Sequence, residues 1–274
     1  YDLAWLATDP KTTIDDDYEY RMKTIAHEYF HNWTGDKIAC RNWFHLTFKE
    51  GFSRFRDQLY IAEQTDAASV RINMVRHICT NQFTEDSSPN AHACLIDAYI
   101  DPRNLYSHTV VDKGQEITHM LCTVLGWQKF KAGCDLFFRR WAGKAVAIDD
   151  LLSAMQEASG VNLAQFKRWY SAAGTCEITA SGDYDSAAHA YTLTLSQSLR
   201  YQGTTEPSAP LHIPIALGLL GRETGRQLPL QLDGESAPSA GCTRLIELRK
   251  LEETYRFINV TELPVVSLLR DFSA

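Results

Sequence analysis

The chain has 274 residues, of which 45% are hydrophobic and 22% are charged, and its formal net charge is −7. This length and composition are typical of a globular protein with one large domain or two ordinary ones. The moderate negative charge is spread along the sequence, which argues against the basic surface that binds nucleic acid or an anionic membrane. We therefore expect neither nucleic acid nor a membrane as a partner.

The seven cysteines form no CxxC pair, and their odd number argues against the disulfide framework of a secreted protein. They favour a reducing compartment, and we expect the protein to be cytoplasmic. The first residues have neither a basic segment nor a long apolar run, and no stretch reaches about 18 apolar residues. The sequence therefore predicts no targeting or membrane-spanning segment. It begins with Tyr1 rather than Met, so we expect it to be a piece of a longer protein.

A first helix is predicted from about residue 15 to residue 33, with a stop at Thr34-Gly35. Its apolar residues recur at intervals of three or four, the period of an amphipathic helix, and they are Tyr18, Met22, Ile25, Tyr29 and Trp33. We expect this stripe to face the core. The same interpretation covers the other aromatic residues nearby, Phe30, Trp43 and Phe44.

A second amphipathic helix, which carries Glu50, is predicted from the stripe Phe48, Phe52, Phe55, Leu59 and Ala62. Further helical patterns cover residues 66–83, 110–125, 130–141, 148–159 and 162–172. After Ala173-Gly174 the helical periodicity ends, and short segments rich in β-forming residues follow, separated by turn residues, at 191–196, 211–217, 244–248, 255–260 and 265–269. We predict an α+β protein in which a mainly helical domain, residues 1–174, precedes a small antiparallel β-sandwich, residues 175–274.

A metal site is indicated by His27, Glu28 and His31, which form an HExxH motif on the first predicted helix. Residues four apart share a helix face, so both imidazoles can reach one ion while Glu28 faces the same cleft as a candidate catalytic base. A catalytic zinc needs three protein ligands and an open fourth position, and Glu50 would complete the set. We expect one Zn²⁺ per chain.

A chance HExxH in a solvated His/Glu face is the alternative, since three specified letters arise by chance in about a few per cent of chains this long. The amphipathic context of both helices favours the zinc site. Asp57 lies two helical turns after Glu50 and is expected to hydrogen-bond a ligand histidine from outside. A surface Asp57 paired with Arg54 or Arg56 is the alternative. The other histidines lack ligand spacing, and we assign no role to His45, His77, His108, His119, His189 and His212.

Three segments resemble the bacterial aminopeptidase N type of zinc metallopeptidase, a gluzincin family with the pattern HExxH-x18-E. They are HEYFHNWTG at 27–35, CRNWFHLTFKEG at 40–51 and FRDQ at 55–58, and weaker similarity spans nearly the whole chain. The resemblance implies the later part of a thermolysin-like catalytic domain followed by a β-sandwich. It also implies peptide substrates, a zinc-activated water that removes N-terminal residues, and further N- and C-terminal domains. The GAMEN motif that grips the substrate amine in this family would lie upstream of Tyr1.

Two places depart from the family pattern. One is the segment after Pro89, which usually reads His-Pro-x-Arg-Pro in the family but is His92-Ala-Cys-Leu-Ile here, and the other is the position of an oxyanion donor. The family places a Tyr, whose hydroxyl stabilises the oxyanion, directly before an acidic-Lys-Gly segment, whereas Val111 precedes Asp112-Lys113-Gly114 here. Tyr106 matches another Tyr of the family segment and is a candidate substitute. The alternatives to an aminopeptidase are therefore a zinc-binding pseudoenzyme or peptide-binding module with little or no hydrolysis, and an endopeptidase with the same chemistry.

Overall fold

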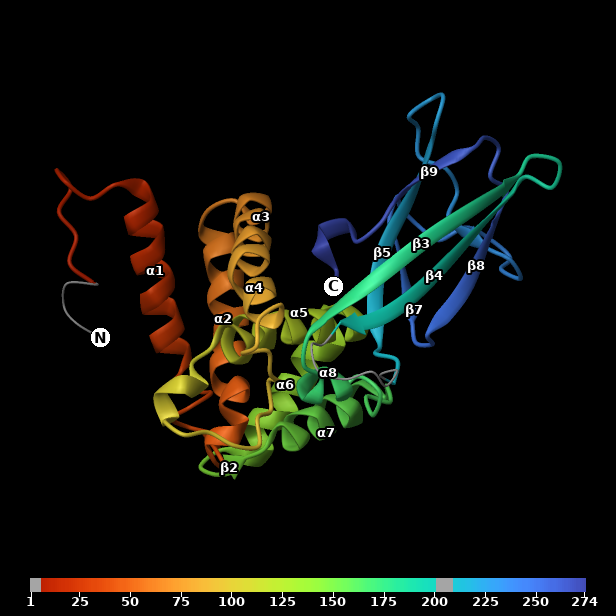
Figure 1. The fold of residues 1–274 in the computed structure, drawn as a ribbon. Helices are drawn as coiled ribbons and strands as arrows, with labels where there is room; N and C mark the ends of the chain where they lie inside the picture. The colour runs from red at the N-terminus through yellow and green to blue at the C-terminus, as the bar shows by residue number, and fades with distance from the viewer. Residues whose placement is uncertain (1–5, 201–208) are drawn as a thin grey trace. The chain divides into compact units, whose positions relative to one another are not determined.

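The computed structural model describes residues 6–200 and 209–274, which divide between Ala173 and Gly174 into a helical unit and a β unit (Figure 1). The predicted α+β class, with a mainly helical part followed by a β-sandwich, is confirmed. No helix within the described residues has the length and apolar character needed to cross a membrane.

The helical unit is organised around α2, Leu46–Gln64, whose buried face carries Phe48, Phe52 and Phe55. These rings pack against α6, Trp127–Trp141, with the ring centroids of Phe48 and Phe137 5.5 Å apart. Burial of such side chains stabilises the folded state by about 1.5–3 kcal/mol each. The apolar stripe predicted for this helix is thus largely part of the core. The helix begins at Leu46, so Glu50 lies in its second turn.

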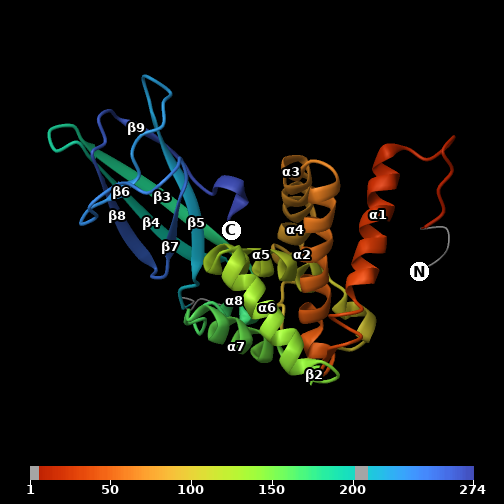
Figure 2. The ribbon, with the colours of Figure 1, turned by 180° about the vertical axis from the view of Figure 1, so that it is seen from behind.

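Two further helices pack against α2. The helix α5, Gly114–Leu125, crosses α2 at a pair of glycines, because a Cβ on Gly51 would lie only 2.6 Å from the carbonyl carbon of Gly114. The helix α1, Asp15–Phe30, runs alongside α2 in both ribbon views (Figures 1 and 2). Three Asp residues in its first turn stabilise the helix through their favourable interaction with the positive end of the helix dipole. This packing brings the end of α1 against the first turns of α2.

The predicted orientation of α1 is wrong. Thr24, Ala26 and His27 face inward, whereas the predicted stripe lies largely outward, with Ile25 54% and Tyr29 60% exposed. Trp43 is also exposed, so the aromatic residues near the motif are not one core cluster. The reason is that α2 packs on the face of α1 that carries the histidines, and a 3.6-residue period does not reveal which of two faces a neighbouring helix covers.

The other predicted helical segments are helical in the structure, with one exception. The helix predicted at 66–83 corresponds to α3, Ala67–His77, a π-helical segment, Ile78–Gln82, and the single turn of α4, Phe83–Asp86, which ends three residues later than predicted. A π-helical segment, Thr109–Lys113, leads into α5, and α7 spans Ile148–Ser159. The predicted helix 162–172 is wrong, because only α8, Arg168–Ser171, is helical there. Side-chain acceptors hold a turn in place instead, with Asn162 Oδ1 2.9 Å from the Ala164 amide nitrogen.

The β unit consists of two antiparallel sheets. One has the order β3-β4-β8-β6, formed by Thr175–Asp185, Ala190–Arg200, Glu252–Ile258 and Gln231–Leu232. The other has the order β7-β5-β9, formed by Arg244–Leu248, Ile213–Gly221 and Pro264–Ser267. All five β-prone runs contain strands, whereas β3 was not predicted. It is an edge strand without a buried residue, so it lacks the alternation of buried and exposed side chains that marks a half-buried strand.

A short parallel pair, β1 (Ala39–Cys40) and β2 (Ala145–Val146), belongs to the helical unit.

Candidate metal centre

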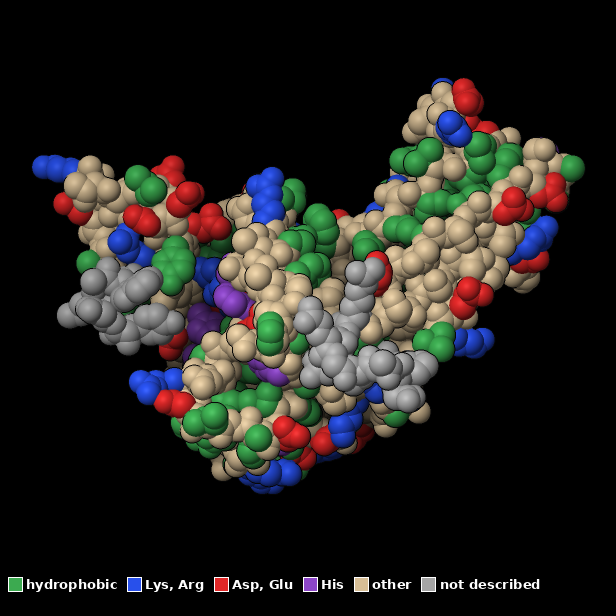
Figure 3. Space-filling view, in the orientation of Figure 1, with side chains coloured by type: hydrophobic (Ala, Val, Ile, Leu, Met, Phe, Trp, Pro, Cys, Tyr) green, Lys and Arg blue, Asp and Glu red, His purple; other side chains and the backbone are tan. Residues whose placement is uncertain are grey.

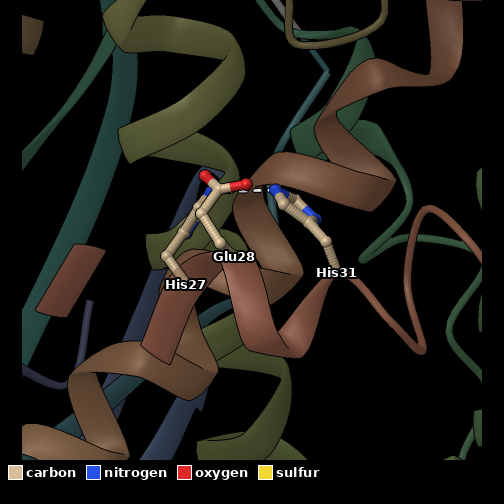
Figure 4. A group of neighbouring side chains, drawn as sticks. All are labelled: His27, Glu28 and His31. Atoms are coloured by element: carbon tan, nitrogen blue, oxygen red, sulfur yellow. Dashed lines mark hydrogen bonds between the residues drawn. The ribbon is translucent and has the colours of Figure 1, made fainter. Parts of the chain in front are cut away.

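The end of α1 carries the three residues of the HExxH motif. The regular helix ends at Phe30, but His31 keeps a right-handed helical backbone and so remains one turn from His27. Both histidines are buried, and their Nε2 atoms lie 3.0 Å apart. Glu28 is exposed, and its carboxylate lies on the same side of the helix as the two imidazoles (Figure 4). Histidine side chains are visible in the hollow of the helical unit beside α1 (Figure 3).

Glu50 approaches the two imidazoles from the first turns of α2. Its Oε2 atom lies 3.2 Å from His27 Nε2 and 3.5 Å from His31 Nε2. The side chain is buried, and its second oxygen, Oε1, lies 3.3 Å from Lys49 Nζ. The structure thus brings together all three residues that the sequence predicted as ligands, with Glu28 beside them.

The outer nitrogens of both imidazoles have fixed partners. Asp57 Oδ2 lies 2.9 Å from His27 Nδ1, and this carboxylate is fully buried. His31 Nδ1 lies 2.9 Å from the Thr34 carbonyl oxygen and 3.1 Å from Ser53 Oγ. A protonated Nδ1 that donates to an acceptor leaves Nε2 free as a ligand, which is how ligand histidines in metal sites are commonly held. Asp57 therefore has the position expected of an outer partner. Its second oxygen has no hydrogen-bond partner among residues 6–200 and 209–274.

The donor set fits zinc. Two imidazole nitrogens and one carboxylate oxygen converge within 3.5 Å of one another, and this His₂Glu set is one that catalytic zinc uses. Burial disfavours the charged form of each group, but the hydrogen bonds outweigh it. Asp57 and Glu50 raise the pKa of His27 to about 9, and His27 and His31 lower the pKa of Glu50. Glu50 is therefore ready to bind as a carboxylate.

A pocket of about 250 Å³ lies beside this centre, and it is lined by Cys40, Asn42, Trp43, Leu46, Lys49 and Tyr106. Tyr106 is half exposed. Burial and the negative charges of Glu50 and Glu28 raise the pKa of its phenol, so the hydroxyl stays protonated and able to donate at neutral pH. Val111 lies in the π-helical segment Thr109–Lys113 and has no donor side chain.

Comparisons with known proteins identify the family of the chain. Residues 1–170 match the sequence pattern of the peptidase family M1 domain, and residues 174–274 match a domain of unknown function with an Ig-like fold. The chain belongs to peptidase family M1. It is 42% identical to aminopeptidase N of Escherichia coli over 263 residues, which are 96% of this chain and 30% of that protein. It is 38% identical to aminopeptidase N of Haemophilus influenzae over 274 residues, or 31% of that protein.

A solved structure of an aminopeptidase A agrees in fold. The structure of this Legionella pneumophila enzyme in complex with aspartic acid superimposes on 98% of the M1 chain with a TM-score of 0.79 and 26% identity. The matched region is 28% of that enzyme. The M1 chain thus spans about three tenths of the relatives it matches, so the activity of the whole protein is argued separately below.

Zinc affinity of the M1 chain is expected to depend on pH. His27 has a pKa of about 9 without metal, and zinc needs the neutral imidazole, so zinc binding at pH 7 must release one proton. Affinity should therefore rise about tenfold per pH unit from pH 7 to about 9 and then level off. A chelator-competition titration of the metal-free protein at several pH values measures this slope, and a flat profile would contradict the assigned His27 environment.

The structure also brings together residues to which the sequence analysis gave no role. His77 at the end of α3 and His108 both lie against Asp112. Sequence spacing does not reveal this group, because the two histidines are 35 and 4 residues from Asp112 and only the shorter separation is visible in a sequence. Lys49 was also missed, although its place next to Glu50 was a signal.

Proposed function

We propose that the full-length protein is a zinc-dependent aminopeptidase that removes N-terminal residues from peptides. The observation that carries the proposal is the convergence of His27 Nε2, His31 Nε2 and Glu50 Oε2, with Glu28 next to them, in a chain of peptidase family M1. Relatives named aminopeptidase N support the exopeptidase class.

In this proposal His27, His31 and Glu50 hold the zinc. Bound zinc supplies Lewis acidity, which lowers the pKa of water to about 7 and polarises a carbonyl. Glu28 accepts the proton of the attacking water and then donates it to the leaving amine, since it reaches the same space as both imidazoles and is exposed to solvent. Asp57, Ser53 and the Thr34 carbonyl keep the two rings oriented.

Tyr106 is proposed as the donor that stabilises the oxyanion. It lines the same pocket as Lys49, the neighbour of Glu50, and its phenol is close enough to feel the charges of Glu50 and Glu28. Donors of this kind need a protonated group that faces the developing negative charge. The phenol of Tyr106 is protonated at neutral pH, so in this proposal it supplies the hydrogen-bond donor that the Val111 side chain cannot supply.

Replacement of Asp57 by Asn is expected to weaken zinc binding by about 10–100-fold, the typical loss when the outer partner of a ligand histidine is changed. The amide cannot supply the charge that now favours a protonated His27 Nδ1. Chelator competition gives the zinc dissociation constant. The control is Asp66→Asn at the exposed start of α3, which should leave this constant unchanged. An Asp57 variant with wild-type zinc affinity would contradict the assigned role.

The activity is tested on the zinc-loaded full-length protein. Chromogenic aminoacyl amides and an N-blocked peptide are assayed side by side, and we expect cleavage of the aminoacyl amides alone. Cleavage of only the blocked peptide would overturn the aminopeptidase proposal in favour of an endopeptidase. Zinc removal with a chelator should abolish activity, and added zinc should restore it.

The second candidate is a zinc-bearing pseudoenzyme or peptide-binding module, which Val111 favours. Loss of one oxyanion donor costs about 10²–10³ in rate, or about 2.7–4 kcal/mol, without affecting the metal ligands. If neither substrate is cleaved while one zinc per chain remains bound, the module is the better description. Peptide binding measured by calorimetry would then replace the assay of turnover.

A further inference from the structure

A second group of metal-ligating side chains lies outside the candidate zinc centre. His77 is the last residue of α3, His108 directly precedes the π-helical segment Thr109–Lys113, and Asp112 lies on that segment, four residues after His108. Asp112 Oδ2 lies 3.0 Å from His77 Nε2 and 2.7 Å from His108 Nδ1, and the two imidazole rings are 5.6 Å apart. Two imidazole nitrogens from separate parts of the chain therefore meet at one carboxylate oxygen.

We propose that His77, His108 and Asp112 form a second binding site for a divalent transition metal, distinct from the HExxH centre. The three donor atoms lie within 4.8 Å of one another, so one ion can contact all of them after small side-chain movements. Imidazole nitrogens with a carboxylate oxygen suit Zn²⁺, Ni²⁺ and Cu²⁺, whereas Mg²⁺ and Ca²⁺ prefer oxygen ligands alone. Asp112 is buried, whereas the histidine side chains are 37% and 46% exposed, which leaves the outer side of the site open to water ligands.

The surroundings of the site hold its ligands in place. Asn81 Nδ2 lies 3.1 Å from His77 Nδ1, so the amide fixes this ring with Nε2 towards Asp112. The same Nδ2 atom donates to the His77 carbonyl oxygen at 3.0 Å, so a metal on Nε2, which places the ring proton on Nδ1, requires the amide to turn and give up that bond. Both imidazoles lie on Oδ2 of Asp112, whereas Arg54 Nε lies 3.8 Å from the other oxygen. A metal on Oδ2 therefore leaves the arginine pair intact.

Two positive charges oppose a cation here. Arg54 pairs with Asp112, and Lys23 lies close enough for Asp112 to influence its pKa, which burial lowers overall. The site also has one carboxylate, like the HExxH centre, but its histidines are more exposed. We therefore expect weaker binding at this site than at His27, His31 and Glu50.

The histidines are the residues to vary. Arg54 contacts both Asp112 and Asp57, each at 3.8 Å, and Asp57 supports His27, so a change of Asp112 would disturb the zinc centre as well. His77→Asn and His108→Asn remove one ligand each and leave that chain of contacts in place. His189→Asn in the β unit is the control, because His189 is an exposed histidine with a positive φ that asparagine tolerates.

The experiment is a Ni²⁺ titration, by isothermal calorimetry, of the full-length protein loaded with one equivalent of Zn²⁺, with nickel and zinc then counted by mass spectrometry after gel filtration. We expect one equivalent of nickel in addition to the retained zinc. Each histidine variant should bind that nickel at least about 10–100-fold more weakly, since loss of a ligand costs no less than loss of an outer partner. The control should bind it as the wild type does.

Two results would overturn the second site. One is nickel that only displaces zinc, with no increase in total metal; the other is added nickel whose affinity both histidine variants leave unchanged. Zinc content and the circular dichroism spectrum of each variant show whether it remains folded. If a variant unfolds, the number of nickel and zinc ions bound per wild-type chain still tests the second site. Because the measurement counts metal and not hydrolysis, it stands apart from the proposed aminopeptidase activity.

Discussion

Glu28→Gln in the zinc-loaded full-length protein is expected to lower kcat for an aminoacyl amide by about 10²–10⁴, the range that general acid–base catalysis contributes. The amide has nearly the same shape as the carboxylate, but it cannot accept the proton of the attacking water. Zinc should stay bound, because Glu28 is exposed and the carboxylate in contact with His27 Nε2 and His31 Nε2 is that of Glu50. Initial rates give kcat, and mass spectrometry gives the zinc content.

The matched control is Glu19→Gln, nine residues earlier on the same helix, which we expect to leave kcat unchanged. The comparison separates the loss of a general base from a general loss of negative charge on α1. Loss of zinc from the Glu28 variant would show that Glu28 is a ligand and that the roles of Glu28 and Glu50 were assigned wrongly. Unchanged kcat with zinc retained would remove Glu28 from the mechanism.

The ligand set was predictable from the sequence because its spacing follows local geometry. His27 and His31 are one helical turn apart, and their convergence needs only that the backbone stay helical through His31. Glu50 is a long-range partner, but an apolar stripe marked its helix, and the family resemblance supplied the pairing. The order of a helical part and a β-sandwich followed in the same way from the change in periodicity after Gly174.

The features that the sequence analysis predicted wrongly or missed depend on tertiary packing, which a local sequence pattern does not reveal. The outward face of α1 is the more apolar one, yet α2 covers the face with Thr24 and His27. The meeting of His77 with Asp112 depends on the approach of α3 to the π-helical segment before α5. Pairs of this kind, 35 residues apart, have no common period and become visible only when the helices are placed.

The oxyanion donor is the step at which this chain departs from the family pattern, and two substitutions test it together. Tyr106→Phe is expected to lower kcat by about 10²–10³, the typical effect of removing one such donor, with a small change in KM. The hydroxyl is needed where negative charge develops, so its loss affects the transition state more than substrate binding. Tyr60→Phe on α2, an exposed tyrosine outside the pocket lining, is the control and should leave kcat unchanged.

Val111→Tyr supplies the reciprocal test. It places a hydroxyl at the position where the resembling family has its donor, and we expect it to recover at least about tenfold of the kcat lost in the Tyr106→Phe variant, because one donor can replace another that serves the same charge. The partial burial of Val111 is compatible with a larger side chain that reaches solvent. If Tyr106 acts alone, Val111→Tyr in the wild-type background should change kcat little, since the oxyanion already has its donor. A large gain in that background, with no loss from Tyr106→Phe, would mean that Tyr106 does not serve the oxyanion and that the natural chain works without this donor.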